Sequence, residues 1–178
     1  MDDAEKRFTA LYDRWYPRVL AYALTHTQPH VAEDIVSETF IVAWRRLATV
    51  PEPALPWLLG VARNIRLKHH EGQRRQDALV ARVEATTTES DIQAWDVADL
   101  VVERTTALRV LANLPPDDLE LLVLTLWQGL TAQDAARVLG CSRTALFVRL
   151  HRARRRLRKA LTQAASNIDH RLHAAATL

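Results

Sequence analysis

Nine basic residues and no acidic residue lie between Arg137 and Lys159. Like charges crowded on one helix repel each other and destabilise it unless an anion neutralises them. A polyanion such as DNA is therefore the expected partner of this stretch. The alternative is a solvated helix surface that only keeps the domain soluble, a reading that fits scattered charges better than a run of one sign.

The basic stretch is the second of two helix-length segments that flank Gly140-Cys141-Ser142. The first, Ala132 to Leu139, has apolar residues at helical spacing and is preceded by Thr131 as an N-cap. Gly140 is suited to end this helix, and Ser142 to cap the next one. The second segment carries one apolar stripe, formed by Leu146, Leu150, Ala153 and Leu157. This pattern predicts a helix-turn-helix whose second helix is the recognition helix.

The N-terminal half predicts a small helical bundle that would position further functional residues. Apolar residues recur at helical spacing from Phe8 to Ala23, where Pro17 is expected to kink or divide the helix. A second helix is expected from His30 to Leu47 and a third from Trp57 to about His70. Between them, the prolines of the segment Leu47–Pro56 predict a stiff loop. The aromatic residues expected in the cores are Phe40, Trp44, Trp57 and Trp127.

Charge is unevenly distributed along the chain although the net charge is only +3. The segment from Gln76 to Glu103 has seven acidic residues against Arg82, a formal charge of −6. We expect an all-α fold of two small helical domains joined by a flexible acidic linker. The expected divisions are an N-terminal bundle (1–75), the linker (76–96), a C-terminal helix-turn-helix domain (97–162) and a tail (163–178). Packing helices are expected at Val97–Asn113 and Asp117–Gln128, and a frayed helix in the tail.

The cysteine count and the N-terminal segment indicate the compartment. Cys141 is the only cysteine, which excludes an intrachain disulfide and favours a reducing environment. The charged segment MDDAEKRFTA has no apolar signal core, and no segment has the apolar length needed to span a bilayer. We therefore expect a cytoplasmic protein without membrane insertion.

Three segments, in this order, carry a resemblance to a known family: AEDIVSETFIVAW, PWLLGVARN and SRTALFVRLHRARRRL. Together they resemble the extracytoplasmic-function (ECF) sigma factors of bacterial RNA polymerase, over roughly Phe8 to Leu161. The resemblance implies a transcription initiation factor that binds the polymerase core enzyme and directs it to promoter DNA. It implies no enzymatic activity and no cofactor. The implied partners are the β′ clamp helices, the β subunit, promoter DNA and an anti-sigma factor.

The resemblance also implies three sets of functional residues. The helix containing AEDIVSETF would bind the β′ clamp helices through Asp34, Glu38 and Ile41. The −10 promoter element would be bound by Arg63, Asn64, Arg66 and Lys68, with Leu47–Pro56 as a specificity loop. The −35 element would be bound by Ser142, Arg143, Thr144, Phe147, Arg149, Arg152 and Arg155. Among these, Arg143, Thr144 and Phe147 are best placed for bases, and the later arginines for phosphates.

Two other classes of function compete with this interpretation. A free-standing helix-turn-helix regulator would use the N-terminal half as a sensor, which requires a pocket with convergent polar groups. A hydrolase or nuclease would require a carboxylate or histidine cluster, but Asp34 and Glu38 have no basic or nucleophilic partner in the pattern. We expect no metal site, because His69 and His70 are adjacent and so point apart, and Pro29 interrupts the pair His26 and His30.

Overall fold

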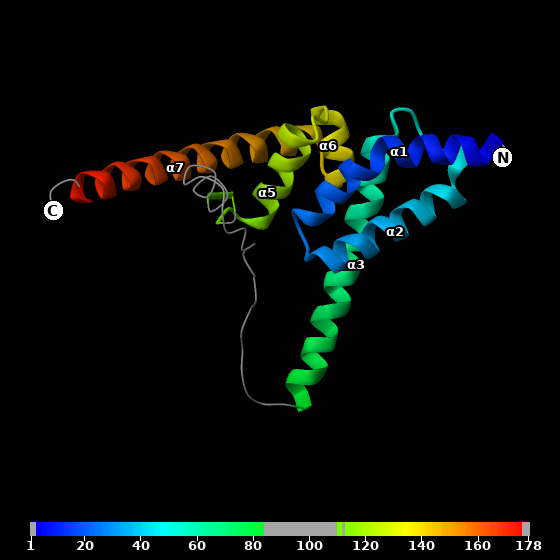
Figure 1. The fold of residues 1–178 in the computed structure, drawn as a ribbon, viewed down its shortest axis with the longest axis horizontal. Coiled ribbons are helices and arrows are strands. Elements are labelled where there is room, and N and C mark those ends of the chain that lie inside the picture. Colours follow the sequence, from blue (N-terminus) through cyan, green and yellow to red (C-terminus); the bar gives the residue numbers. More distant parts are fainter. Residues whose placement is uncertain (1–2, 84–109, 112, 176–178) are drawn as a thin grey trace.

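The structure of the chain is a computed structural model that describes residues 3–83, 110–111 and 113–175 (Figure 1). Within these ranges all regular secondary structure is helical, which confirms the predicted all-α class. None of the helices described there combines the length and apolar character that crossing a membrane demands.

Three helices make up the N-terminal half: α1 (Asp3–Leu24), α2 (Pro29–Arg45) and α3 (Ala54–Val83). Each of the three packs against the other two, as in the predicted bundle. Pro17 lies within α1 but does not divide it. A short 3-10 helix, η1 (Leu47–Thr49), follows α2.

The third helix differs from its prediction at both ends. It begins at Ala54 rather than Trp57, so Pro56 lies within its first turn and not in a loop. Proline is tolerated there because the first backbone N–H groups of a helix have no intrahelical acceptor. The helix also continues to Val83, so residues 76–83 of the expected linker are helical. The rest of that linker, and most of the helix expected at Val97–Asn113, lie outside the described residues.

The C-terminal half contains α5 (Pro116–Leu122), η2 (Val123–Trp127), α6 (Ala132–Leu139) and α7 (Arg143–Ala175). Helices α5 and α6 pack against α7. The segment expected as a separate, frayed tail continues α7 as far as Ala175, so α7 is one helix of 33 residues. Figure 1 shows α7 extending well beyond the helices that pack on its first half.

The predicted helix Asp117–Gln128 is interrupted by the π-helical segment η2. The Gln128 N–H donates to the Val123 carbonyl at 2.8 Å, a bond that spans five residues instead of four. The wider turn changes the direction in which the following side chains point. Trp127, expected in the core, is 75% exposed, so that prediction was wrong.

The helix-turn-helix has the predicted boundaries and caps. The Thr131 hydroxyl accepts a hydrogen bond from the Asp134 N–H at 3.1 Å at the start of α6. Gly140 ends α6 with φ of 64°, in the left-handed region where glycine has no steric penalty. The Ser142 hydroxyl accepts from the Ala145 N–H at 3.1 Å and caps α7.

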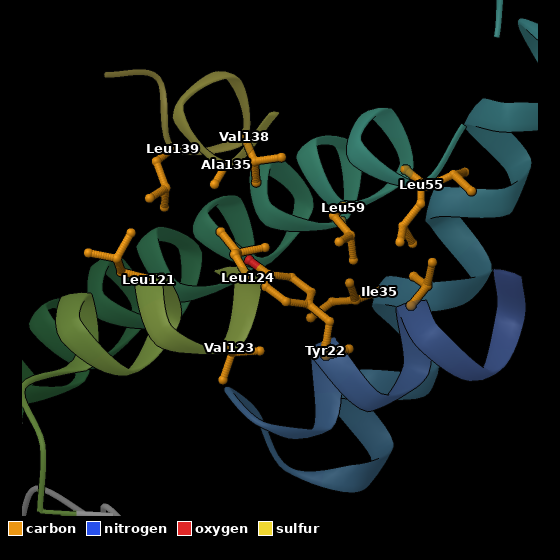
Figure 2. Packing of buried hydrophobic residues seen from close by; sticks show 14 of the residues in the cluster. Tyr22, Ile35, Leu55, Leu59, Leu121, Val123, Leu124, Ala135, Val138 and Leu139 are labelled. Atoms are coloured by element: carbon orange, nitrogen blue, oxygen red, sulfur yellow. The ribbon is translucent and has the colours of Figure 1, made fainter. Parts of the chain in front are cut away.

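Buried side chains from both halves of the chain form one continuous hydrophobic core. Helix α3 lies against α6, which joins the bundle to the helix-turn-helix. Figure 2 shows Tyr22 of α1, Leu59 of α3, Leu124 of η2 and Val138 of α6 converging on this region. The two units that the sequence predicts therefore share a packed interface.

Replacing Leu124 by Ala tests this core. Leu124 is fully buried, so Leu124→Ala should lower the free energy of unfolding by about 2–5 kcal/mol. Urea denaturation followed by circular dichroism measures the change. Leu126→Ala, two residues away at a side chain that is 56% exposed, is the matched control and should change stability by less than about 0.5 kcal/mol. Equal effects of the two substitutions would contradict the burial of Leu124 in the core.

Candidate nucleic-acid and protein interfaces

Helix α7 buries its predicted apolar stripe and leaves a basic face exposed. Leu146, Leu150 and Ala153 are buried, and Leu157 is half-buried. The guanidinium of Arg143 lies 5.6 Å from the centre of the Phe147 ring, a cation–π contact. Of the seven residues predicted for −35 DNA, six are exposed: Ser142, Arg143, Thr144, Phe147, Arg152 and Arg155.

The seventh predicted residue, Arg149, is half-buried and faces the acidic start of α5. Its Nη2 lies 3.6 Å from Oδ2 of Asp117. Two helical turns further along α7, Nη1 of Arg156 donates to Oδ2 of Asp118 at 2.5 Å. These two pairs attach α7 to α5 and neutralise part of its positive charge. Arg149 and Arg156 thus support the position of the helix, whereas the exposed Arg143, Arg152 and Arg155 can reach a polyanion.

The residues predicted to contact the polymerase lie on the exposed side of α2. Asp34 and Glu38 are exposed, and Ile41 is 50% exposed. Glu38 is joined to α3, because its Oε1 lies 2.8 Å from Nε2 of His69. A carboxylate pair and an exposed apolar residue on one helix can contact a basic protein surface.

Aromatic side chains next to these residues form a groove between α1 and α2, with a volume of about 280 Å³. Phe40, predicted in the core, is buried, but Trp44, also predicted there, is 46% exposed and stacks edge-on against Phe8 at 5.1 Å. Such a surface suits apolar side chains of a protein partner better than a polar small molecule. The lining residues are Phe8, Tyr12, Tyr16, Val36, Ser37, Phe40, Ile41 and Trp44.

The four residues predicted for −10 DNA on α3 are divided into two pairs. Asn64 and Lys68 are exposed. Arg63 and Arg66 are instead directed at Glu120 of α5, with Arg63 Nε at 3.2 Å and Arg66 Nη2 at 2.7 Å from its Oε1. Their side chains are only 21% and 16% exposed.

Glu120 is 3% exposed and forms the centre of a polar cluster between the two halves. The Tyr22 hydroxyl of α1 also donates to Glu120 Oε1, at 2.7 Å. Burial alone would raise the pKa of the Glu120 carboxyl, but the Tyr22 hydrogen bond and the charges of Arg66 and Arg63 outweigh burial and lower it. The carboxylate therefore stays ionised. We call Glu120, Tyr22, Arg63 and Arg66 the Glu120 cluster.

His26 of α1 packs beside this cluster, with its ring centre 5.0 Å from that of Tyr22. Its buried Nε2 has no hydrogen-bond partner among the described residues. Burial, and next the positive charge of Arg66, lower the pKa of His26 to about 4. The imidazole is thus neutral at physiological pH and contributes packing instead of charge.

A second contact joins the same two halves at the end of η2. Arg18 Nε donates to the side-chain Oε1 of Gln128 at 3.0 Å, and its Nη2 donates to the Gln128 carbonyl. The Gln128 amide in turn donates to the Arg18 carbonyl at 3.1 Å. Gln128 is only 2% exposed, so this interaction is shielded from water.

The sequence patterns did not identify Glu120, Tyr22, Arg18 or Gln128 as functional. One signal was present, because Glu120 is an acidic residue within the apolar run Leu119–Leu122 and must bury its charge against a cation. The identity of that cation depends on tertiary packing. No cluster of metal-ligating side chains occurs within the ranges that the structure describes.

Two regions of the chain match known protein families. Residues 11–76 match Sigma-70 region 2, and residues 104–157 match Sigma-70, region 4. The chain is also 31% identical to the RNA polymerase sigma factor CarQ of Myxococcus xanthus, over 90% of this chain and 92% of CarQ. The chain belongs to the ECF sigma factors.

This sigma factor is also similar to two further relatives. It is 35% identical to the probable RNA polymerase sigma factor RfaY of Xanthomonas campestris pv. campestris, over 82% of this chain but only 38% of RfaY. The sigma factor RpoE of Bartonella quintana, solved in complex with the anti-sigma factor NepR, is 25% identical with a TM-score of 0.66. That similarity covers 88% of this chain and 98% of the solved one.

Acidification should destabilise the sigma factor through His26. The folded state keeps His26 neutral down to about pH 4, whereas the unfolded chain takes up a proton near the ordinary pKa of 6.5. Stability is therefore lost as pH falls through this interval, by about 2 kcal/mol between pH 7 and pH 5. Glu120, with a lowered pKa, adds its loss only at lower pH.

Urea denaturation at several pH values measures this dependence, and His26→Gln is the matched variant. The variant should show a flatter dependence of unfolding free energy on pH between 5 and 7, because it removes the titrating group. An equally steep dependence in His26→Gln would assign the effect to other residues.

Proposed function

We propose that this sigma factor binds the core enzyme of RNA polymerase and directs it to promoters through −10 and −35 elements. The observation that carries the proposal is the exposed basic face of α7 within a chain that matches sigma regions 2 and 4 in the family order. A basic recognition helix supported by a capped helix-turn-helix is built to enter the major groove of DNA.

In this proposal α7 binds the −35 element. Arg143, Thr144 and Phe147 lie in its first turns, at the end of a recognition helix that reaches base edges. Arginine can form two hydrogen bonds with guanine, and phenylalanine can contact the thymine methyl group. Arg152 and Arg155 lie further along the exposed face, where phosphate contacts set position and affinity.

The −10 element would be bound along α3. Asn64 has an exposed amide that can pair with the edge of a flipped base, and exposed Lys68 can hold the single-strand backbone. Arg63 and Arg66 would supply the remaining phosphate contacts once released from Glu120. The segment 47–56, between α2 and the first turn of α3, would act as the specificity loop.

Two apolar surfaces suit protein partners in the polymerase. The groove between α1 and α2 lies beside Ile41, so the β′ clamp helices could contact Asp34 and Glu38 by charge and the groove by apolar packing. Leu126 and Trp127, exposed on η2, offer a second apolar surface, which we assign to the β subunit. The complex of the Bartonella relative with NepR supports an anti-sigma factor as a further partner.

The same proposal makes the protein a non-enzymatic factor that acts in the cytoplasm, where the polymerase works. A sensory regulator would require a pocket with convergent polar groups. The groove between α1 and α2 is instead lined mainly by aromatic and aliphatic side chains, which favours a protein contact. Asp34 and Glu38 lie on an exposed helix surface with His69, which does not resemble a buried hydrolytic site.

Charge reversal on α2 tests the polymerase contact. Asp34→Arg combined with Glu38→Arg should abolish association with core polymerase, because two attractive charges become repulsive. Both residues are exposed, so helical circular dichroism should be unchanged. Pull-down of the β′ subunit measures binding. The single variant Asp34→Arg is measured as well, and Asp13→Arg, a charge reversal at an exposed residue of α1, is its matched control. Retained pull-down by the double variant would place the interface elsewhere.

Transcription from a library of −35 variants tests the proposed function and separates base reading from phosphate contact. Wild-type holoenzyme should initiate selectively, and Arg143→Ala should cost about 1–3 kcal/mol on the preferred element and reduce discrimination at one position. Arg152→Ala should weaken all sequences alike and reduce the slope of log affinity against log salt by about one.

These measurements have two adverse outcomes. No selective initiation by wild type with core enzyme would refute the proposed function. A uniform loss across all −35 variants with Arg143→Ala would make Arg143 a phosphate contact.

A further inference from the structure

Arg63 and Arg66 have two incompatible uses, one shown in this structure and one required by the proposed function. Both guanidinium groups donate to Oε1 of Glu120, and both side chains are largely covered. A carboxylate oxygen and a phosphate oxygen are similar acceptors for arginine, with the same sign of charge. The two cannot occupy the same donors at the same time.

We infer that Glu120 is an intramolecular competitor for nucleic acid, which masks half of the −10 surface while the two halves are packed together. The inference rests on the proposed function, since it assumes that α3 binds the −10 element. Glu120 takes the place that a backbone phosphate would occupy against Arg63 and Arg66. In the free chain only Asn64 and Lys68 of the predicted set remain available.

The packing around Glu120 holds this competitor for phosphate in a fixed position. Glu120 is 3% exposed and is fixed by a third donor, the Tyr22 hydroxyl at 2.7 Å. The paired contacts between Arg18 and Gln128 hold the neighbouring segment against α1. A phosphate approaching α3 would therefore meet a fixed negative charge and two occupied arginines.

The competition also couples nucleic-acid binding to the separation of the two halves. Glu120 lies on α5 and the arginines on α3, so a phosphate that captures the arginines removes the ionic part of the interface. A partner that separates the halves therefore strengthens the binding of nucleic acid to α3. By linkage, bound nucleic acid strengthens the binding of that partner by the same factor. Core polymerase, which would bind both halves, is suited to this role.

Glu120→Gln in the free, full-length chain is the first test. It keeps the shape of the side chain and removes the charge, so the arginines lose their ionic partner. Affinity for a fluorescent single-stranded DNA of random sequence, about 12 nucleotides long, should rise about tenfold if about a tenth of the wild-type chains are competent. Fluorescence anisotropy measures this, and adding Arg63→Ala and Arg66→Ala to the variant should remove the gain.

Asp118→Asn is the matched control, because Asp118 is a second buried carboxylate on α5 but pairs with Arg156 of α7. It removes the same charge without touching α3 and should leave affinity for the oligonucleotide within about twofold of wild type, because the pairs of Arg63 and Arg66 with Glu120 stay in place. An equal gain in both variants, or no gain in Glu120→Gln, would overturn the inference.

A second measurement keeps the inference testable if Glu120→Gln does not fold. Arg63→Ala leaves Glu120 with Arg66 and Tyr22, so the cluster is retained. In the free chain it should barely change oligonucleotide binding, whereas Lys68→Ala, at an exposed residue, should weaken it. In the holoenzyme both substitutions should weaken promoter binding. Equal losses in the free chain would show that Arg63 is already available and would refute the masking.

The two proposals fail in different ways. Wild-type holoenzyme that initiates selectively, together with an unmasked Arg63 in the free chain, would refute only the inference about Glu120. Wild-type protein that gives no selective initiation would refute the proposed function, whatever the oligonucleotide measurements show.

Discussion

The arrangement of the helices depends on one buried carboxylate. Glu120 accepts hydrogen bonds from α1 and α3 while it belongs to α5, so a single oxygen joins three helices from both halves. Loss of one partner from a buried ion pair typically costs about 3–5 kcal/mol, because the remaining charge has no compensation. A buried ion pair of this kind therefore discriminates strongly between the packed and the separated halves.

The distribution of charge explains how a short chain can present several surfaces. The acidic start of α5 holds Arg149 and Arg156, which leaves the remaining basic residues of α7 on its outer face. On α2 the exposed carboxylates of Asp34 and Glu38 lie beside an aromatic groove. The basic face of α7 and the acidic side chains of α2 thus give the chain surfaces of opposite charge, and the aromatic groove shares Val36 and Phe40 with the hydrophobic core.

Local signals made the helix-turn-helix predictable, whereas tertiary contacts determined what the sequence did not reveal. Thr131, Gly140 and Ser142 act through hydrogen bonds and backbone geometry within a few residues, so their types and spacing were sufficient. The fold class and the buried stripe of α7 followed from apolar periodicity. The partner of Glu120 lies more than fifty positions away, and the exposure of Trp127 depends on a π turn that no spacing rule indicates.

That π turn has a consequence for the length of the chain at this point. A π turn accommodates one residue more than the α-helix it interrupts, and each residue rotates the helix by about 100°. Deleting a single residue from Val123–Trp127 would restore ordinary helical pairing and turn Gln128 away from Arg18. Length at this position is therefore as constrained as residue type. Insertions and deletions in this protein should be tolerated at loop 47–53 before they are tolerated here.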